Sequence, residues 1–379
     1  MTESGSIDQR RLLVRRSASQ LLDRRIAGGP DAVVRALLAV QAQDRSAWRL
    51  ALRARVDAIT ADDVNRALSD TRSLLVAWLN RGTLHLVCSD DYPWLLALTA
   101  PTHLVASARR LAQEGLTPDD VERGVACIER SLATEGPLLR AQLRERLAAR
   151  GIRTEGQATV HLLFAAVVRG VAVLGPVLAG GHAFAHAREW LGSGADPPAG
   201  DWRERALAEL ARRYLVGHGP ATDGDLAKWA GLPLRDARAG LRSIGAELVE
   251  LDGGLVELTA SRASEADLGP SIERLPPRLL PAFDPSLLGW RQREPFLRPV
   301  DEPQVIPVGG GLFRAFATVD GTAAATWAIR RSGARAAIRI DPFEALGADD
   351  VAALRAEAED VARFEGRMLA GVDGLVKPA

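Results

Sequence analysis

The sequence predicts an α+β fold in which tandem helix-turn-helix modules, each carrying a β hairpin, precede a smaller module of β-barrel type. Two observations predict this fold. Amphipathic helical patterns followed by a hairpin signal recur over the first two thirds of the chain, and strand-like runs between glycine turns fill the last third. A chain of 379 residues has room for about two to four such modules.

Helix signals dominate the start of the first expected module, which covers residues 7–90. The run 17–22 predicts the start of a helix, and the turn at 28–31 (Gly-Gly-Pro-Asp) predicts its end and the beginning of the next helix. Residues 60–63 (Thr-Ala-Asp-Asp) predict the cap of a further helix that runs through Leu68.

A hairpin closes the first module. The runs 74–78 and 83–87 have the composition of strands, and between them Asn80-Arg81-Gly82 is a tight-turn signal. Helices followed by a hairpin are the order of a winged helix, so we expect residues 7–90 to form one.

A weak repeat predicts two more winged helices, at 91–190 and 200–262. Gly136-Pro137 and Gly219-Pro220 each break the chain before a short helix, a further helix and β-type residues. In the later copy, Asp252-Gly253-Gly254 is the turn signal of a hairpin.

The last expected module, at 275–379, changes character. Prolines introduce it, and strand-like runs between glycine turns predict a partial barrel closed by a final helix. The predicted strands cover 305–308, 312–319, 322–329 and 336–340, and the predicted helix covers 348–368.

Bulk properties exclude several classes of protein. We find no apolar run long enough to span a bilayer, and the N-terminal residues lack the order of a signal peptide. Cys88 and Cys127 offer neither a disulfide framework nor a zinc cluster. His182 and His186 have the spacing of a zinc pair but lack the glutamate of a zinc hydrolase and a third ligand. We therefore expect a cytoplasmic protein without a metal or cofactor.

The positive charge of the chain is almost entirely arginine. Net charge is zero, and the lysines are Lys228 and Lys377. The first sixty residues are basic, and arginine suits bidentate contact with phosphate. An ordinary set of solvated helix faces explains the same residues equally well. They are Arg10, Arg11, Arg15, Arg16, Arg24, Arg25, Arg35, Arg45, Arg49, Arg53 and Arg55.

One short motif carries most of the functional information. Gln41-Ala42-Gln43 follows an apolar helical stretch and precedes Asp44 and Arg45, where a buried helix face would be expected to continue. Together with 81–85 (Arg-Gly-Thr-Leu-His), 280–291 and the glycines 309–311, this segment resembles the AlkZ-like winged-helix DNA glycosylases. The resemblance covers most of the chain and consists of short motifs that occur in the same order as in that family.

The resemblance implies a monofunctional DNA glycosylase that hydrolyses the N-glycosidic bond of cationic N7- or N3-alkylated purines in double-stranded DNA. Some members of the family carry Gln-apolar-Asp. The double-glutamine form implies bulky adducts and interstrand crosslinks as further substrates. Gln41 and Gln43 would be catalytic, with Asp44, Arg45, Arg81, Thr83 and His85 as electrostatic or DNA-contacting residues. The resemblance also implies a nucleoid-associated monomer with no membrane contact.

Glutamine suits this chemistry although it cannot be a general base. A purine alkylated at N7 or N3 leaves as a neutral base, so the leaving group needs no acid. Two amide oxygens could place a water at the anomeric carbon and face an oxocarbenium-like sugar with negative dipole ends. In extended backbone, Gln41 and Gln43 would point the same way and could share that water.

Structural alternatives remain open for each of these residues. The glutamines could cap a helix end, and Asp44 could be the N-cap of a helix through Trp48 and Leu52. Arg81, Thr83 and His85 could serve only the hairpin. For the whole protein, the alternatives are a winged-helix transcriptional regulator without catalysis and a scaffold with a vestigial glutamine pair.

Overall fold

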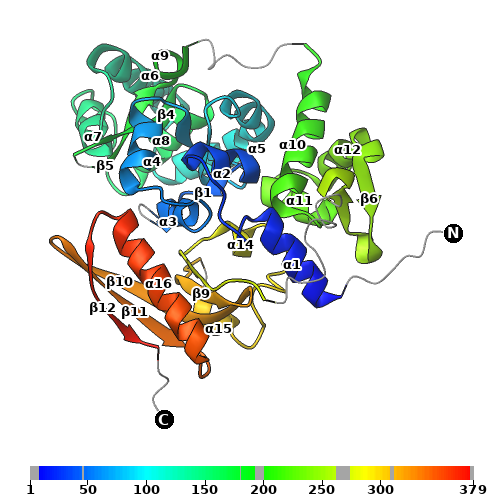
Figure 1. Ribbon diagram of the computed structural model, residues 1–379. Coiled ribbons are helices and arrows are strands. Elements are labelled where there is room, and N and C mark those ends of the chain that lie inside the picture. Colours follow the sequence, from blue (N-terminus) through cyan, green and yellow to red (C-terminus); the bar gives the residue numbers. More distant parts are fainter. Residues whose placement is uncertain are drawn as a thin grey trace. The chain divides into compact units, whose positions relative to one another are not determined.

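The chain folds into two compact units, each with its own core (Figure 1). Unit 1 comprises Met1–Val64, Leu207–Trp229 and Pro233–Ala379, and unit 2 comprises Asn65–Ala206 and Ala230–Leu232. The computed structural model describes residues 8–44, 47–179, 181–192, 200–261, 274–307 and 311–375. The finer division into modules at 7–90, 91–190, 200–262 and 275–379 stays a prediction.

The N-terminal part of unit 1 is a series of short helices. They are α1 (Gln9–Ser19), α2 (Pro30–Leu37) and α3 (Ala47–Arg53), with the short strand β1 (Val40–Gln41) between α2 and α3. Helix α4 (Ala61–Ser69) follows, and its residues from Asn65 onward belong to unit 2.

The caps predicted for α2 and α4 are confirmed, whereas the predicted start of the first helix is wrong. Gly29 precedes Pro30 at the start of α2, and Thr60 and Asp63 exchange hydrogen bonds at the start of α4. The run 17–22 ends α1, because the helix begins eight residues earlier, at Gln9, where the Asp8 carboxylate caps it. Arginines between the apolar positions of α1 hid its helical pattern.

The middle of unit 1 has the element order that the repeat predicts. Its elements are α10 (Trp202–His218), α11 (Asp223–Ala230), α12 (Leu234–Ser243), a single turn at Gly245–Glu247, β6 (Leu248–Glu250) and β7 (Val256–Leu258). The first residues of α10, up to Ala206, and Ala230 at the end of α11 belong to unit 2. The predicted turn at 252–254 connects β6 and β7, and Gly253 and Gly254 both have a φ of 73°. Directly after Pro220, Ala221 forms an antiparallel bridge with Val256.

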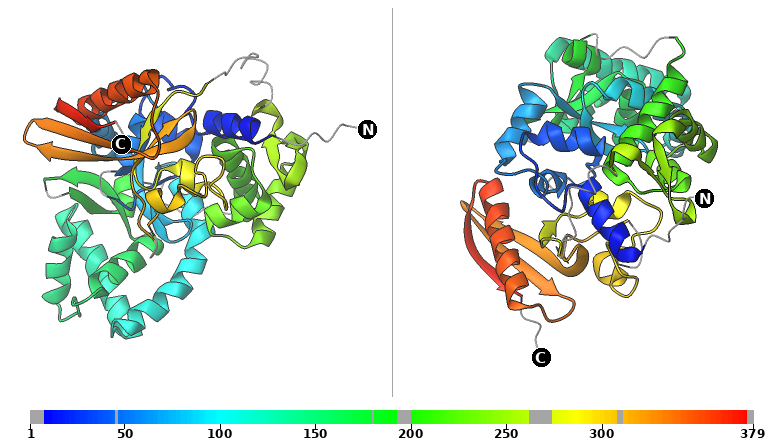
Figure 2. Two further views of the ribbon diagram at one scale, coloured as in Figure 1. Left: turned by 90° about the horizontal axis from the view of Figure 1, so that it is seen from below. Right: turned by 45° about the vertical axis from the view of Figure 1, so that its right-hand side comes forward.

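The C-terminal part of unit 1 is an open five-stranded sheet with a helix on one face (Figures 1 and 2). The strand order is β12-β11-β10-β9-β8, and the pairing is antiparallel except for the parallel pair β11 and β12. Helix α16 connects this parallel pair and packs against the sheet. The elements are β8 (Arg278–Leu280), α14 (Pro285–Leu288), α15 (Glu302–Val305), β9 (Phe316–Val319), β10 (Thr322–Ser332), β11 (Arg335–Pro342), α16 (Ala348–Phe364) and β12 (Met368–Gly374).

Three expectations for this part are corrected. The sheet is not closed, because β12 and β8 lie at its two edges. Val305 ends a helix rather than starting a strand, and Val308 lies outside the described residues. The final helix ends at Phe364, four residues before its predicted end, because the chain turns at Gly366 with a φ of 65° and Met368 begins another strand.

A cluster of buried aromatic rings surrounds His218 in unit 1. Tyr214 stacks on His218 with ring centroids 4.8 Å apart, and Trp229 and Trp290 pack around the same imidazole. A Cβ on Gly289 would lie 2.5 Å from the His218 ring. This close approach explains the glycine before Trp290 in the segment 280–291.

Unit 2 combines helices with a sheet made from two hairpins. The helices are α5 (Tyr92–Gln113), α6 (Pro118–Glu135), α7 (Arg140–Ala148), α8 (Ala158–Val168) and α9 (Ala187–Leu191), and the strands are β2 (Leu74–Leu79), β3 (Thr83–Cys88), β4 (Ala172–Leu178) and β5 (Gly181–His186).

The first hairpin of unit 2, β2–β3, matches its predicted position, and it is joined to the second by pairing of Val76 with Leu174. Directly after Pro137, Leu138 forms an antiparallel bridge with Phe184. Both copies of the predicted repeat therefore have a β-bridge directly after Gly-Pro. In both, two helices and then a hairpin follow this bridge.

Candidate functional site

The glutamine motif follows a tightly fixed stretch of backbone in unit 1. Residues Leu37 to Val40 are almost completely buried. Between α2 and β1, Leu38 has a φ of 65° and a ψ of −45°, and the Ala39 N–H donates to the Leu37 carbonyl oxygen at 2.8 Å. This is a γ-turn of the rare strained kind. Such strain persists only where the surrounding packing imposes it and is found preferentially at functional sites.

The motif itself leaves the core in extended form. Gln41 ends β1 and is partly exposed, Ala42 is buried, and Gln43 is exposed. Alternating burial is what an extended backbone produces, because successive side chains point to opposite sides. The exposure pattern therefore fits the expected placement of both amides on one accessible side.

Asp44 acts as a cap in this structure. Its carboxylate oxygen Oδ1 accepts a hydrogen bond from the Ala47 backbone N–H, the first residue of α3, at 2.9 Å. This geometry matches the capping alternative for Asp44, and the exposed carboxylate still adds negative charge beside the glutamines. Arg45 lies outside the described residues.

The charge of Asp44 also reaches the C-terminal sheet of unit 1. On β10, the hydrogen-bonded carboxylate of Glu365 raises the pKa of Arg331, and the negative charge of Asp44 adds to that rise. The ion pair of Arg331 and Glu365 therefore belongs to the electrostatic surroundings of the motif.

Several N-terminal arginines that were candidates for phosphate contact are buried instead. Arg53 and Arg55 have no exposed surface, and Arg16 is 5% exposed. Arg53 bonds to the carboxylates of Glu357 and Asp360, and burial lowers the pKa of Arg16 to about 10. These cations hold unit 1 together, so the basic composition of this segment overstates the charge available to DNA.

Glu357 is the acceptor at the centre of one such cluster. It lies on α16, is nearly buried, and receives ion pairs from Arg25, Arg53 and Arg278. Burial opposes its ionisation, but the charges of these arginines prevail and its pKa is lowered. The cluster therefore ties the N-terminal helices to the C-terminal sheet through a charged carboxylate.

The three candidate residues of the β2–β3 hairpin, Arg81, Thr83 and His85, differ in their exposure to solvent. His85 is buried, and its Nδ1 lies 2.8 Å from the Thr83 carbonyl oxygen. Burial, helped by the charge of Arg81, lowers the pKa of His85 to about 3. His85 is therefore neutral at physiological pH and cannot serve as a cation for phosphate, which agrees with a role inside the hairpin. Arg81 and Thr83 are partly exposed.

A histidine of α5, His103, contacts the turn of this hairpin. Asn80 has a φ of 47° and Gly82 a φ of 77°, and the ring nitrogen Nε2 of His103 lies 2.5 Å from the Asn80 carbonyl oxygen. The Arg81 backbone is thereby fixed between two residues in left-handed conformations. The tight-turn signal in the sequence found this feature, but His103 gave no signal because it is 23 residues away.

Phe283 is a candidate that sequence reasoning did not single out. It has a φ of 60°, which is a genuine outlier for a bulky residue. Its ring lies 4.9 Å from that of Phe313, and the Arg293 guanidinium lies over Phe313. A partly exposed aromatic pair beside a cation can stack against an unpaired base. The only sequence signal was its place beside Asp284 in the motif segment.

The other chemistry considered from the sequence gains no support from geometry. His182 and His186 lie on strand β5, where four residues separate side chains by roughly 13 Å, so they cannot share a metal as a pair on a helix does. Within the described residues, no group of three or more metal-binding side chains gathers, and no helix is long and apolar enough to cross a membrane.

Comparison with known proteins decides the family. The model of the family described as DNA glycosylase AlkZ-like matches residues 34–364. The chain belongs to the AlkZ-like DNA glycosylases. The matched region contains the glutamine motif, the β2–β3 hairpin and the Phe283–Asp284 segment.

Two comparisons extend the match of this AlkZ-like chain over nearly its whole length. It is 26% identical over 368 residues to the interstrand DNA cross-link repair glycosylase of Streptomyces sahachiroi, covering 94% of this chain and 96% of that protein. The solved structure of Streptomyces sahachiroi DNA glycosylase AlkZ superposes with a TM-score of 0.78 at 26% identity, covering 97% of this chain and 99% of the other.

Proposed function

We propose that this protein is a monofunctional DNA glycosylase that releases cationic N7- or N3-alkylated purines from double-stranded DNA, including bulky adducts and interstrand crosslinks. Family membership supports the reaction class, and a relative named as an interstrand cross-link repair glycosylase supports crosslinks as substrates. The observation that carries the proposal is the presentation of Gln41 and Gln43 by an extended segment behind a fully buried turn.

The reaction needs water placement more than acid catalysis. Because the alkylated purine is already cationic, its departure as a neutral base requires no proton donor. Gln41 and Gln43 would orient one water toward the anomeric carbon and direct the negative ends of two amide dipoles at the developing oxocarbenium ion. The strained Leu38 turn would keep both side chains in place before the substrate arrives, so less ordering is needed during reaction.

We assign DNA binding to three winged-helix modules. Both predicted repeats show the order helix, bridge, helix, helix, hairpin, with bridges at Leu138 and Ala221. In the first module, β1 would correspond to the bridges at Leu138 and Ala221 in the second and third modules. Like them, it directly precedes a helix. On that assignment the glutamines extend the first module's bridging strand, and Arg81 at the hairpin tip would contact phosphate.

The scarcity of amines supports a monofunctional reaction. A glycosylase that also breaks the strand attacks the anomeric carbon with an amine and forms a Schiff base. Of the two lysines, Lys228 lies on α11 with its Nζ donating to the Arg291 carbonyl oxygen at 3.2 Å, and Lys377 lies outside the described residues. The product would then be an abasic site in an intact strand.

Single-turnover excision tests the proposal. Duplex DNA with one N7-methylguanine is incubated with excess protein, and alkali then breaks the strand wherever the base has been lost. Gln41→Ala and Gln43→Ala should each slow excision by about 10²–10³-fold, the usual cost of removing one placed group at a transition state.

The matched control is Gln9→Ala, an exposed glutamine at the start of α1, which should excise at the wild-type rate. If both motif variants excise within a few-fold of wild type, the pair takes no part in catalysis. If the wild-type protein binds the duplex yet releases no base from any alkylated substrate, the protein is a DNA-binding regulator or scaffold.

A further inference from the structure

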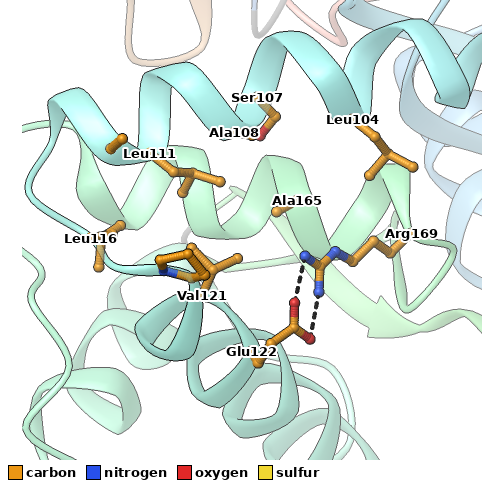
Figure 3. A pocket seen from close by; sticks show the side chains of 11 residues that line it. Leu104, Ser107, Ala108, Leu111, Leu116, Val121, Glu122, Ala165 and Arg169 are labelled. Carbon is orange, nitrogen blue, oxygen red and sulfur yellow. Dashed lines mark hydrogen bonds and ion pairs between the residues drawn. The ribbon is translucent and has the colours of Figure 1, made fainter.

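The groove between α5, α6 and α8 of unit 2 has a largely apolar lining (Figure 3). Among its described lining residues, Glu122 and Arg169 alone are charged, and they pair with each other at 2.9 Å. The hydroxyl oxygen of Ser107 is buried beneath the surface of the groove. The groove therefore contains no group that would select a ligand, whereas a glycine in unit 1 contacts the backbone that leads to the glutamine motif.

This glycine is Gly217, which is buried in the last turn of α10. A Cβ at this position would lie 2.8 Å from the Ala36 carbonyl oxygen and 2.9 Å from the Leu37 Cα, at the end of α2. Both are backbone atoms, which cannot rotate away as the end of a flexible side chain can. Any side chain at residue 217 would therefore push the two helices apart by about half an ångström to reach ordinary contact distance.

The end of α10 is held from its other sides. His218, the next residue, is completely buried, and its ring lies 4.8 Å from that of Tyr214 and 5.7 Å from that of Trp290. The buried Gln20 side chain also donates from Nε2 to the Gly217 carbonyl oxygen at 2.6 Å. Since these contacts hold α10 in place, a displacement at residue 217 would fall on α2.

A displacement of α2 would reach the glutamines over a very short distance. Helix α2 ends at Leu37, the strained turn follows at Leu38, and Gln41 lies three residues after that turn. Strain of this kind persists only where the surrounding packing imposes it. The direct contact of α10 with the end of α2 is part of that packing, and it requires a residue without a side chain.

We infer that Gly217 is a positioning residue for Gln41 and Gln43. Because it has no side chain, α10 touches the backbone of α2 directly, and this contact sets the direction in which the turn at Leu38 presents the two amides. The inference rests on the proposed catalytic role of the glutamines. Gly217 acts on the reaction only through the backbone that connects α2 to β1.

Single-turnover excision of N7-methylguanine from duplex DNA tests the inference with the full-length Gly217→Ala variant. At saturating protein, excision should slow by about 10–100-fold, because a misplacement on the order of 1 Å can cost about 10²-fold in rate. Affinity for the same duplex, measured by fluorescence anisotropy, should stay at the wild-type value. The matched control is Gly371→Ala on β12, where a Cβ would meet no atom within 4 Å, and it should excise at the wild-type rate.

A double variant separates positioning from a general loss of folded protein. If Gly217 acts through the glutamines, Gly217→Ala should slow the Gln41→Ala variant by a clearly smaller factor than it slows the wild type. A loss of folded protein would instead lower both rates by the same factor.

Leu38→Gly tests the same route without added volume. Glycine adopts a φ of 65° without strain, so this variant loosens the turn and leaves the contact of α10 with α2 intact. It should also slow excision while its affinity for the duplex stays at the wild-type value. This test remains decisive even if Gly217→Ala does not fold.

Three results would overturn the inference. One is a wild-type excision rate for Gly217→Ala, and another is an equal loss in the wild-type and Gln41→Ala backgrounds. The third is a wild-type rate for Leu38→Gly, which would show that the turn does not position the glutamines. If Gln41→Ala and Gln43→Ala themselves excise at the wild-type rate, the proposed function fails as well; if they are slow while Gly217→Ala is not, only the role of Gly217 is refuted.

Discussion

The buried ion pair between Arg55 and Asp284 should be a main determinant of the stability of unit 1. Both side chains have no exposed surface. All five N–H groups of Arg55 donate. Their acceptors are the Gln20 carbonyl and amide oxygens, the Ala51 carbonyl oxygen and both carboxylate oxygens of Asp284, at 2.8–3.1 Å.

Replacing Arg55 with Met keeps most of the side-chain length and removes every one of these donors. Asp284 then stays buried with one remaining bond, from the Ser286 N–H at 3.0 Å, and Gln20 loses two. Breaking a buried pair from one side costs about 3–5 kcal/mol, because the remaining charge has no counterpart. We expect Arg55→Met to lower the free energy of unfolding by that amount.

A double-mutant cycle measured by urea unfolding, followed by tryptophan fluorescence, isolates the pair. Asp284→Asn alone should also destabilise strongly, and the double variant should lose clearly less than the sum of the two, with a coupling energy of about 1–3 kcal/mol. Arg339→Met is the matched control, because Arg339 pairs with Asp341 on the exposed surface of the same unit and should leave stability unchanged.

A loss below about 1 kcal/mol for Arg55→Met would refute this reasoning. It would mean that the cavity admits water or that Asp284 finds another partner at little cost. Additive losses in the double variant would show that the two residues stabilise unit 1 independently, despite the bonds between them.

Three further outcomes are expected. Borohydride added during turnover should trap no covalent protein–DNA complex, and a trapped complex would show that an amine attacks the sugar. Affinity for undamaged duplex should fall linearly with the logarithm of salt concentration, whereas an affinity that is flat from about 50 to about 200 mM would argue against phosphate contacts. Lowering the pH from about 7.5 to about 5 should cost about 2 kcal/mol through His85, since burial lowers its folded-state pKa to about 3, below the unfolded value near 6.5. The folded state then binds fewer protons, so this stability is complete above about pH 6.5 and is lost as pH falls toward 3; an equally steep pH dependence in His85→Gln would assign the loss to other groups.

Local signals in the sequence were sufficient where neighbours along the chain decide the structure. The cap of Thr60 and Asp63, the Gly29-Pro30 helix start and the β2–β3 turn all depend on residues within a few positions of one another. The Gly-Pro breaks of the repeat are also local signals of this kind. All of these features could be predicted without knowing what packs against them.

The candidate site was predictable only in part. The identity of Gln41 and Gln43 and their family context came from the sequence, and so did the capping alternative for Asp44, which the structure shows. The turn that precedes the glutamines was not predictable. Its strained positive φ lies at Leu38, whereas the residues that usually indicate such a turn are glycine and asparagine. Phe283 was missed for the same reason.

The sequence by itself determined the motif, the order of helices and hairpins, and the near absence of lysine. Only the tertiary structure decided which arginines are buried in unit 1. Arg53 and Arg55 meet their carboxylates across 304 and 229 residues of sequence, so composition alone could not separate them from arginines at the surface. The physical reason is that a guanidinium is tolerated in a core only where carboxylates and carbonyls converge on it, and that convergence exists only once distant segments have packed together.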